Sequence, residues 1–134
     1  MPGYLLDTNH LSPLVTVGHP LRDRILLLSG QGGVFAIPAP AVTEFLFGIM
    51  LLPRGERNLA EWARLAPSFS YLDVTRRDAE HAARLQVALR RQGWQLSTVD
   101  ALIASIALRN DLTLLTTDGD FDQINSLKIE NWLR

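Results

Sequence analysis

Five acidic residues stand where their carboxylates could do chemistry together. Asp7 follows a short apolar run, and Glu44 lies near the start of an apolar helix. Asp100 falls in the first turn of a second helix, and Asp118 and Asp120 share a turn after another apolar run. A charge embedded in apolar sequence is unfavourable unless something binds it, and carboxylate oxygens are ligands that hard divalent cations prefer. If the fold brings these acids together, we expect the cation pocket of a metal-dependent nuclease.

Most of these acids also have a structural explanation. Asp7 is a good helix cap, and Asp100 fits a capping box begun by Ser97. Asp118 and Asp120 flank a glycine, which is typical of a tight turn. None of these explanations predicts that acids remote in sequence converge. Two unit charges about 4 Å apart repel by about 4 kcal/mol at an effective dielectric of 20, so such a cluster needs a cation or bound protons.

Short apolar runs alternate with helical apolar spacing along the chain, which predicts an α/β fold with a mainly parallel central sheet of four or five strands. Strands are expected at residues 4–6, 34–37, 69–72 and 112–115, with an edge strand at 127–129. Helices are expected within 11–28, where Gly18-His19-Pro20 divides them into two, and at 41–52, 56–65, 76–91 and 97–108. In such sheets ligands bind beyond the carboxyl ends of the strands, where the acids are expected to meet.

Composition limits the class of protein. The 134 residues are about one domain long, so a single domain over 1–134 is expected. The net charge of −1 argues against binding nucleic acid through overall positive charge, although a local patch is compatible with it. All basic residues except Lys128 are Arg, which suits phosphate contact, although a GC-rich genome would give the same bias. The absence of Cys excludes disulfides and Cys-ligated metals.

We expect a cytoplasmic protein that does not enter a membrane. The N-terminus lacks the basic stretch and cleavage pattern of a signal peptide. The longest apolar run, residues 45–53, is much shorter than the roughly 20 residues that a bilayer requires.

The sequence resembles PIN-domain proteins in four motifs that follow one another over nearly the whole chain. They are Leu5-Leu6-Asp7-Thr8-Asn9, Glu44 with Gly48, Gly93 ahead of Asp100-Ala101-Leu102-Ile103-Ala104, and Thr116-Thr117-Asp118-Gly119-Asp120-Phe121. Each motif is weak alone, whereas their order and spacing are specific. Size and coverage are most similar to the VapC-type toxins of toxin–antitoxin pairs.

This resemblance implies a PIN-like α/β/α sandwich and a ribonuclease that hydrolyses RNA phosphodiester bonds with a metal-activated water. It implies one or two Mg²⁺ or Mn²⁺ ions held by Asp7, Glu44, Asp100 and either Asp118 or Asp120, between which the sequence does not decide. Thr8, Asn9 and Thr116 resemble residues that orient the acids and water around the metal. The expected partners are RNA, a VapB-type antitoxin and a second copy of the chain in a homodimer.

The stretch at residues 45–52 is apolar nearly all the way round, which is more than one buried helix face needs. Surplus apolar surface would suit a partner, and in VapC-like proteins the helix after the second strand contributes to antitoxin binding. Full burial in the core is the alternative.

Other charged residues have simpler explanations. His10, His19 and His81 lack helical metal-ligand spacing, and His10 is expected on the surface. The pairs Arg76/Arg77 and Arg90/Arg91 are expected to be exposed charges on one long helix rather than RNA contacts.

Three other functions compete with a nuclease. A phosphotransferase of the haloacid dehalogenase type needs a second Asp two residues after the first and a Lys near the site, but position nine is Asn9 and Lys128 is the only Lys. An aspartate-phosphorylated receiver domain crowds its acids at the first and third strands, so Glu44 and Asp100 fit it poorly. A non-catalytic PIN-like interaction module would not need all the acids intact.

Overall fold

The computed structural model describes residues 3–133, which form a sheet of five strands. The strands are β1 (Gly3–Leu6), β2 (Val34–Pro38), β3 (Ser70–Leu72), β4 (Thr113–Leu115) and β5 (Ile129–Glu130). Their order is β3-β2-β1-β4-β5, and all neighbouring pairs are parallel, which confirms the predicted sheet. The edge strand begins later than predicted because the Leu127 N–H donates to the Ile124 carbonyl in a turn.

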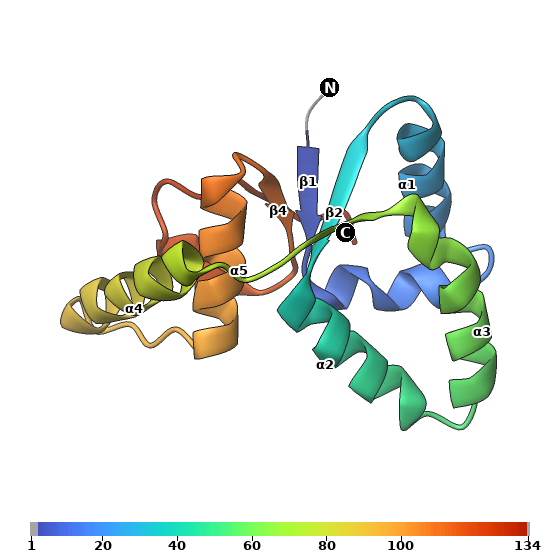
Figure 1. The fold of residues 1–134 in the computed structure, drawn as a ribbon, viewed down its shortest axis with the longest axis horizontal. Helices are drawn as coiled ribbons and strands as arrows, with labels where there is room; N and C mark the ends of the chain where they lie inside the picture. Colours follow the sequence, from blue (N-terminus) through green and yellow to red (C-terminus); the bar gives the residue numbers. More distant parts are fainter. Residues whose placement is uncertain (1–2, 134) are drawn as a thin grey trace.

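Helices cover both sides of the sheet. They are α1 (Pro20–Gly30), α2 (Ala39–Met50), α3 (Gly55–Leu65), α4 (Arg76–Arg91) and α5 (Thr98–Arg109). Figure 1 shows α1, α2 and α3 on one side of the strands and α4 and α5 on the other, so the predicted α/β/α arrangement is confirmed. No helix in the described part of the chain has the length and apolar character needed to cross a bilayer.

The segment between β1 and α1 differs from the prediction. Of the two helices expected within residues 11–28, only α1 is an α-helix. The first is replaced by two 3₁₀ turns, η1 (Thr8–His10) and η2 (Ser12–Val15), with Pro13 in the first turn of η2. These turns redirect the chain immediately after β1, so that the residues of η1 lie beside Asp7.

The order of the strands creates a switch point beside β1. The chain passes from β1 outward to β2 and β3, and then returns to β4 and β5 on the other side of β1. The carboxyl ends of β1 and β4 therefore flank the place where ligands bind in open α/β sheets. The two ends are held together beyond the strands, since the Asp7 N–H donates to the Leu115 carbonyl over 3.0 Å.

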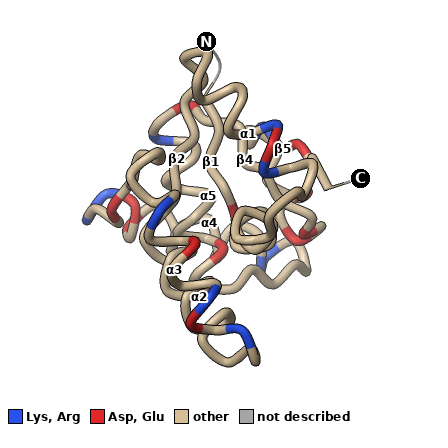
Figure 2. The backbone as a smooth tube through the Cα atoms, turned by 90° about the vertical axis from the view of Figure 1, so that its right-hand side faces the viewer, with Lys and Arg blue, Asp and Glu red and all other residues tan. Residues whose placement is uncertain are grey.

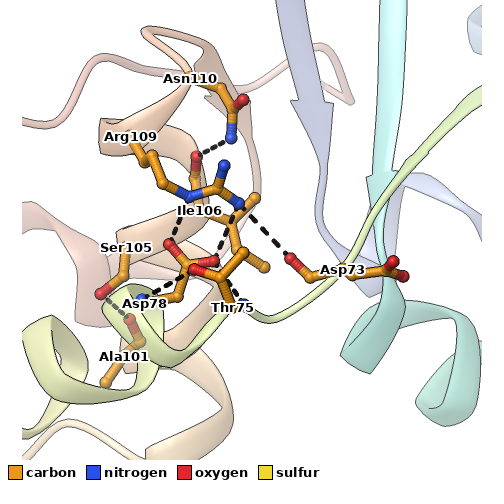
Figure 3. A network of polar contacts seen from close by, with 8 residues as sticks. All are labelled: Asp73, Thr75, Asp78, Ala101, Ser105, Ile106, Arg109 and Asn110. Atoms are coloured by element: carbon orange, nitrogen blue, oxygen red, sulfur yellow. Dashed lines mark hydrogen bonds and ion pairs between the residues drawn. The ribbon is translucent and has the colours of Figure 1, made fainter.

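An ion pair between the exposed Arg109 and the buried Asp78 joins α5 to α4 (Figure 3). The Arg109 guanidinium donates to both carboxylate oxygens of Asp78, over 2.7 Å and 2.9 Å. Asp78 also closes a capping box with Thr75 at the start of α4. Burial alone would raise the pKa of Asp78, but the hydrogen bonds from Arg109 and Thr75 outweigh it and hold the pKa below its usual value. The pair fixes the helix that carries Asp100.

A candidate metal centre

Asp7 is anchored at the end of β1 by hydrogen bonds from both flanking segments. Its side chain is buried, and Oδ1 accepts from the Thr8 N–H over 2.8 Å, as expected of a helix cap. The other oxygen has a different role, since Oδ2 accepts from the Thr116 hydroxyl over 2.7 Å and from the Asn9 amide over 3.3 Å. Thr116 follows β4, so the carboxylate is held between the ends of two neighbouring strands.

Three more acids meet beside this position. One carboxylate oxygen each from Asp100, Asp118 and Asp120 lies within 4.8 Å of the other two. Asp118 also has the turn role that its sequence suggests, because its Oδ1 accepts from the Asp120 N–H over 2.9 Å. Two segments remote in sequence, α5 and the 3₁₀ turn η4 (Gly119–Gln123), thus bring their acids to one place.

The capping-box explanation of Asp100 is only partly correct. The Asp100 N–H does donate to Ser97 Oγ over 3.1 Å, so Ser97 caps α5. Within residues 3–133, no reciprocal hydrogen bond joins the Asp100 carboxylate to the Ser97 N–H. The carboxylate interacts with the Ser97 side chain, which by itself would lower its pKa, and it faces Asp118 and Asp120.

The pKa values of Asp7, Glu44 and Asp100 respond to the charges of neighbouring acids. Burial raises the pKa of Asp100 to about 6, and the charges of Asp7, Asp118 and Asp120 add to the rise. Burial and the charge of Asp118 raise the pKa of Asp7, against the hydrogen bonds that it accepts. Burial, and then the charge of Asp7, raise the pKa of Glu44, which is exposed and lines a hollow beside Thr8. Asp7 and Glu44 thus border the compact group of three acids without belonging to it.

The residues present fit a hard divalent cation. All candidate ligands are carboxylate oxygens, which Mg²⁺ and Mn²⁺ prefer over softer metals. Their mutual repulsion destabilises the site unless positive charge or protons enter it. Within the described part of the chain, the buried Thr8 hydroxyl has no hydrogen-bond partner, and it lines the same hollow as Glu44. A buried hydroxyl without a partner calls for water or an ion.

The prediction that His10 is a surface residue is wrong. Its side chain is fully buried. Its Nδ1 lies 2.7 Å from Asn9 Oδ1, and its Nε2 accepts from the Trp132 N–H over 3.2 Å. Burial lowers the pKa of His10 to about 4, so the ring is neutral near pH 7. Of the other two histidines, His19 caps α1 and His81 is exposed on α4.

The apolar helix α2 is only partly buried. Phe45 and Ile49 lie in the core, whereas Phe47 and Met50, and Leu51 and Leu52 beyond the helix end, are exposed. The alternative of full burial is therefore wrong for the second half of this stretch. The long helix α4 carries Arg76, Arg77, Arg90 and Arg91 as exposed side chains, as predicted.

The chain is similar to known proteins over nearly its whole length. The family model described as "PIN domain" matches residues 4–127. The tRNA(fMet)-specific endonuclease VapC of Shigella flexneri is 26% identical over 131 residues, which cover 96% of this chain and 97% of that protein. Among solved structures, VapBC2 from Rickettsia felis bound to a promoter DNA fragment matches with a TM-score of 0.84 at 25% identity, covering 97% of this chain and 98% of that chain. DNA-bound VapBC from Salmonella typhimurium matches with a TM-score of 0.83 at 25% identity, over 98% and 99% of the two chains.

Proposed function

This chain belongs to the PIN-domain family, and we propose that it is a metal-dependent endoribonuclease of the VapC type, the toxin of a toxin–antitoxin pair. One observation carries the proposal: oxygens of Asp100, Asp118 and Asp120 lie within 4.8 Å of one another at the switch point of the sheet. The family assignment removes the dehalogenase-type and receiver alternatives. A non-catalytic PIN module remains an outcome that the experiment below would reveal.

The ligands of the proposed Mg²⁺ or Mn²⁺ centre are Asp7, Glu44, Asp100 and one or both of Asp118 and Asp120, for one or two ions. A divalent cation bound there would lower the pKa of a water for in-line attack on phosphorus and neutralise charge on the phosphate. The protein's own contribution is to hold the acids in place before the cation arrives. Hydrogen bonds from Thr8, Asn9 and Thr116 fix Asp7, and the cap at Ser97 fixes the turn of α5 that carries Asp100.

An RNA strand would run from the acids along the surface towards α3. The hollow lined by Thr8 and Glu44 adjoins a second hollow lined by Arg54 and Arg57, and the two share Asn58. Within the described residues, Arg54 and Arg57 are exposed and form no ion pair. Guanidinium groups bind phosphate through paired hydrogen bonds, so these side chains suit the backbone of the strand.

This path does not require a basic protein surface. Figure 2 shows Lys and Arg positions interspersed with Asp and Glu along the chain, without a single basic face in this view. A local pair of arginines beside the acids is compatible with the formal net charge of −1. We expect this pair to contribute more to RNA binding than the exposed arginines of α4 do.

The proposed protein partner is a VapB-type antitoxin. The matching structures from Rickettsia felis and Salmonella typhimurium are VapBC complexes. The exposed apolar side chains of Phe47, Met50, Leu51 and Leu52 offer it a docking surface. We further propose that residues 1–134 act as one domain, that the protein forms a homodimer, and that it acts in the cytoplasm, where its RNA substrate is found.

The proposed activity is tested by RNA cleavage with the purified protein. Cleavage should require Mg²⁺ or Mn²⁺ and stop when a chelator is added. Asp7→Asn and Asp100→Asn should each abolish cleavage while circular dichroism shows an unchanged fold. Asp73→Asn is the matched control, because Asp73 is exposed and does not belong to the group of acids. Cleavage at the wild-type rate by either ligand variant would refute the assignment of ligands.

If the purified wild-type protein binds Mn²⁺ but cleaves no RNA, the interaction-module alternative would be favoured. A panel of transfer, ribosomal and messenger RNAs would identify the substrate, since its choice depends on loop shape and charge.

A further inference from the structure

His10 links the metal centre to a segment that follows the last strand. The backbone N–H of Trp132 can only donate a hydrogen bond, so the His10 Nε2 that faces it over 3.2 Å must accept. The single ring proton of a neutral imidazole then resides on Nδ1. That nitrogen lies 2.7 Å from Asn9 Oδ1, which can only accept. The direction of every hydrogen bond through His10 is thereby fixed.

Asn9 connects His10 to Asp7 through hydrogen bonds of fixed direction. Its Oδ1 accepts from His10 Nδ1 and from the Thr117 N–H, the latter over 3.2 Å. Its Nδ2 donates to Asp7 Oδ2 over 3.3 Å and to Thr116 Oγ1 over 3.4 Å. A flip of the amide would place its oxygen against the Asp7 carboxylate. Donors on the far side of the amide prevent that flip, and His10 supplies one of the two.

Trp132, which donates to His10, is held in place by aromatic packing. The Trp132 ring meets the Tyr4 ring edge to face with centroids 4.8 Å apart, and it packs against Phe35 at 5.9 Å. The Arg24 guanidinium lies over the same ring, 3.6 Å from its centroid. The indole N–H donates to Glu130 over 3.0 Å. Trp132 is therefore held against residues of β1, β2 and α1. Its backbone N–H, which donates to His10, is held in place as a result.

We propose that His10 is a positioning residue for the metal centre. It fixes the orientation of the Asn9 amide, so that Asn9 donates to Asp7 Oδ2. Its hydrogen bond from Trp132 ties this arrangement to the segment Asn131–Leu133. The inference deepens the proposed function and rests on it, since Asp7 is one of the proposed ligands. His10 itself contacts neither the ion nor the RNA. Its loss should therefore weaken metal binding and leave the binding of RNA little changed.

Two substitutions separate the hydrogen bond to Asn9 from the one to Trp132. The amide nitrogen of an Asn side chain occupies a place similar to Nδ1, so His10→Asn retains the donor to Asn9. The amide group of Gln reaches a place similar to Nε2, so His10→Gln retains only the acceptor for Trp132. Both variants remove the ring and its packing, which makes them matched in the loss of stability.

The experiment measures the Mn²⁺ dissociation constant, together with kcat and KM for RNA cleavage, in wild type and both variants. Loss of a residue that orients a metal ligand typically weakens metal affinity by about 10–100-fold. We expect that loss for His10→Gln, with KM for RNA within about 2-fold of wild type and with activity recovering at high Mn²⁺. His10→Asn should stay within about 3-fold of wild type in metal affinity. His81→Gln, an exposed change on α4, is the control and should alter none of these values.

The coupling to Asn9 gives a second measurement. In an Asn9→Ala background, His10→Gln should cause no further loss of Mn²⁺ affinity, because the amide that it orients is absent. Equal affinities for His10→Asn and His10→Gln would show that His10 acts through packing alone and would overturn the inference. A wild-type protein that binds no Mn²⁺ and cleaves no RNA would instead refute the proposed function.

Discussion

Replacing Asp100 by Asn should stabilise the metal-free protein, although it removes a proposed ligand. Burial, then the charges of Asp7, Asp118 and Asp120, raise the pKa of Asp100 from 3.8 to about 6. The folded state therefore holds this proton more tightly than the unfolded chain does. The resulting stabilisation is complete below pH 3.8 and is lost as the pH rises through about 6. At pH 7.5 the ionised side chain opposes folding.

The size of the effect follows from the pKa. A rise of about two units corresponds to about 3 kcal/mol, and partial exposure of Asp100 to solvent reduces this to about 1–2 kcal/mol. A negative charge in the first turn of α5 gains only about 0.5 kcal/mol from the helix dipole, so repulsion and burial prevail. Asp100→Asn should thus raise the melting temperature of the chelator-treated protein by about 3–10 °C at pH 7.5. Near pH 4 the gain should disappear.

Added metal should reverse the order of stability. An ion at 100 times its dissociation constant stabilises the folded state by about 2.7 kcal/mol, which exceeds the deficit of the wild type. Thermal or urea unfolding of wild type and Asp100→Asn should be measured with chelator and with Mn²⁺, each at pH 7.5 and at pH 4. Asp73→Asn is the control. A variant less stable than wild type without metal, or one that gains as much from Mn²⁺ as wild type does, would refute the electrostatic reasoning.

The other predictions concern the α4–α5 pair, the RNA path and the partner surface. Asp78→Asn should destabilise the protein by about 1.5–3 kcal/mol in urea unfolding, because it removes the charge-assisted hydrogen bonds that the partly exposed Arg109 guanidinium donates to Asp78. The stability that this pair provides is present above the usual Asp pKa and should be lost as the pH falls through the lowered pKa of Asp78. Arg57→Ala should raise KM for RNA about 3–10-fold with kcat nearly unchanged, whereas the matched Arg76→Ala should change neither. Leu51→Ser should leave the RNase activity intact but prevent co-purification with the proposed VapB-type antitoxin, since the Leu51 side chain is 72% exposed. Co-purification that persists would show that the antitoxin binds another surface.

The sheet and most helices could be predicted from sequence because their signals are local. Short apolar runs at residues 4–6 and 112–115, alternating with helical spacing, indicated buried strands, and α4 begins and ends where its spacing indicated. The position of Asp7 after β1 followed from the same reasoning. The convergence of acids from three distant segments could then be expected from the general behaviour of parallel sheets.

Two helix starts with the same spacing of residues show what the sequence could not predict. Thr75 to Asp78 and Ser97 to Asp100 have the same pattern, yet only the first forms a complete box. Arg109 is brought to Asp78 by the packing of α4 on α5 and holds its carboxylate in place. Asp100 instead faces other acids, which no residue nearby in sequence could reveal.

The burial of His10 was equally hidden. A helical continuation after Asp7 would have let its side chain reach solvent, but the 3₁₀ turn η1 directs the ring inward. Its partner Trp132 lies 122 residues away, so no local pattern records their contact. The contact between His10 and Trp132 is therefore visible only in the folded structure.

The central position of β1 has a consequence for how the protein is made. Translation produces Asp7 early, but Thr116, which donates a hydrogen bond to it, is added 109 residues later. At about 5–20 residues per second this takes roughly 5–20 s, during which β1 lacks β4 and the acids of η4 are not yet attached. A nascent chain, or a fragment released by a premature stop codon before β4, should therefore lack the complete group of acids.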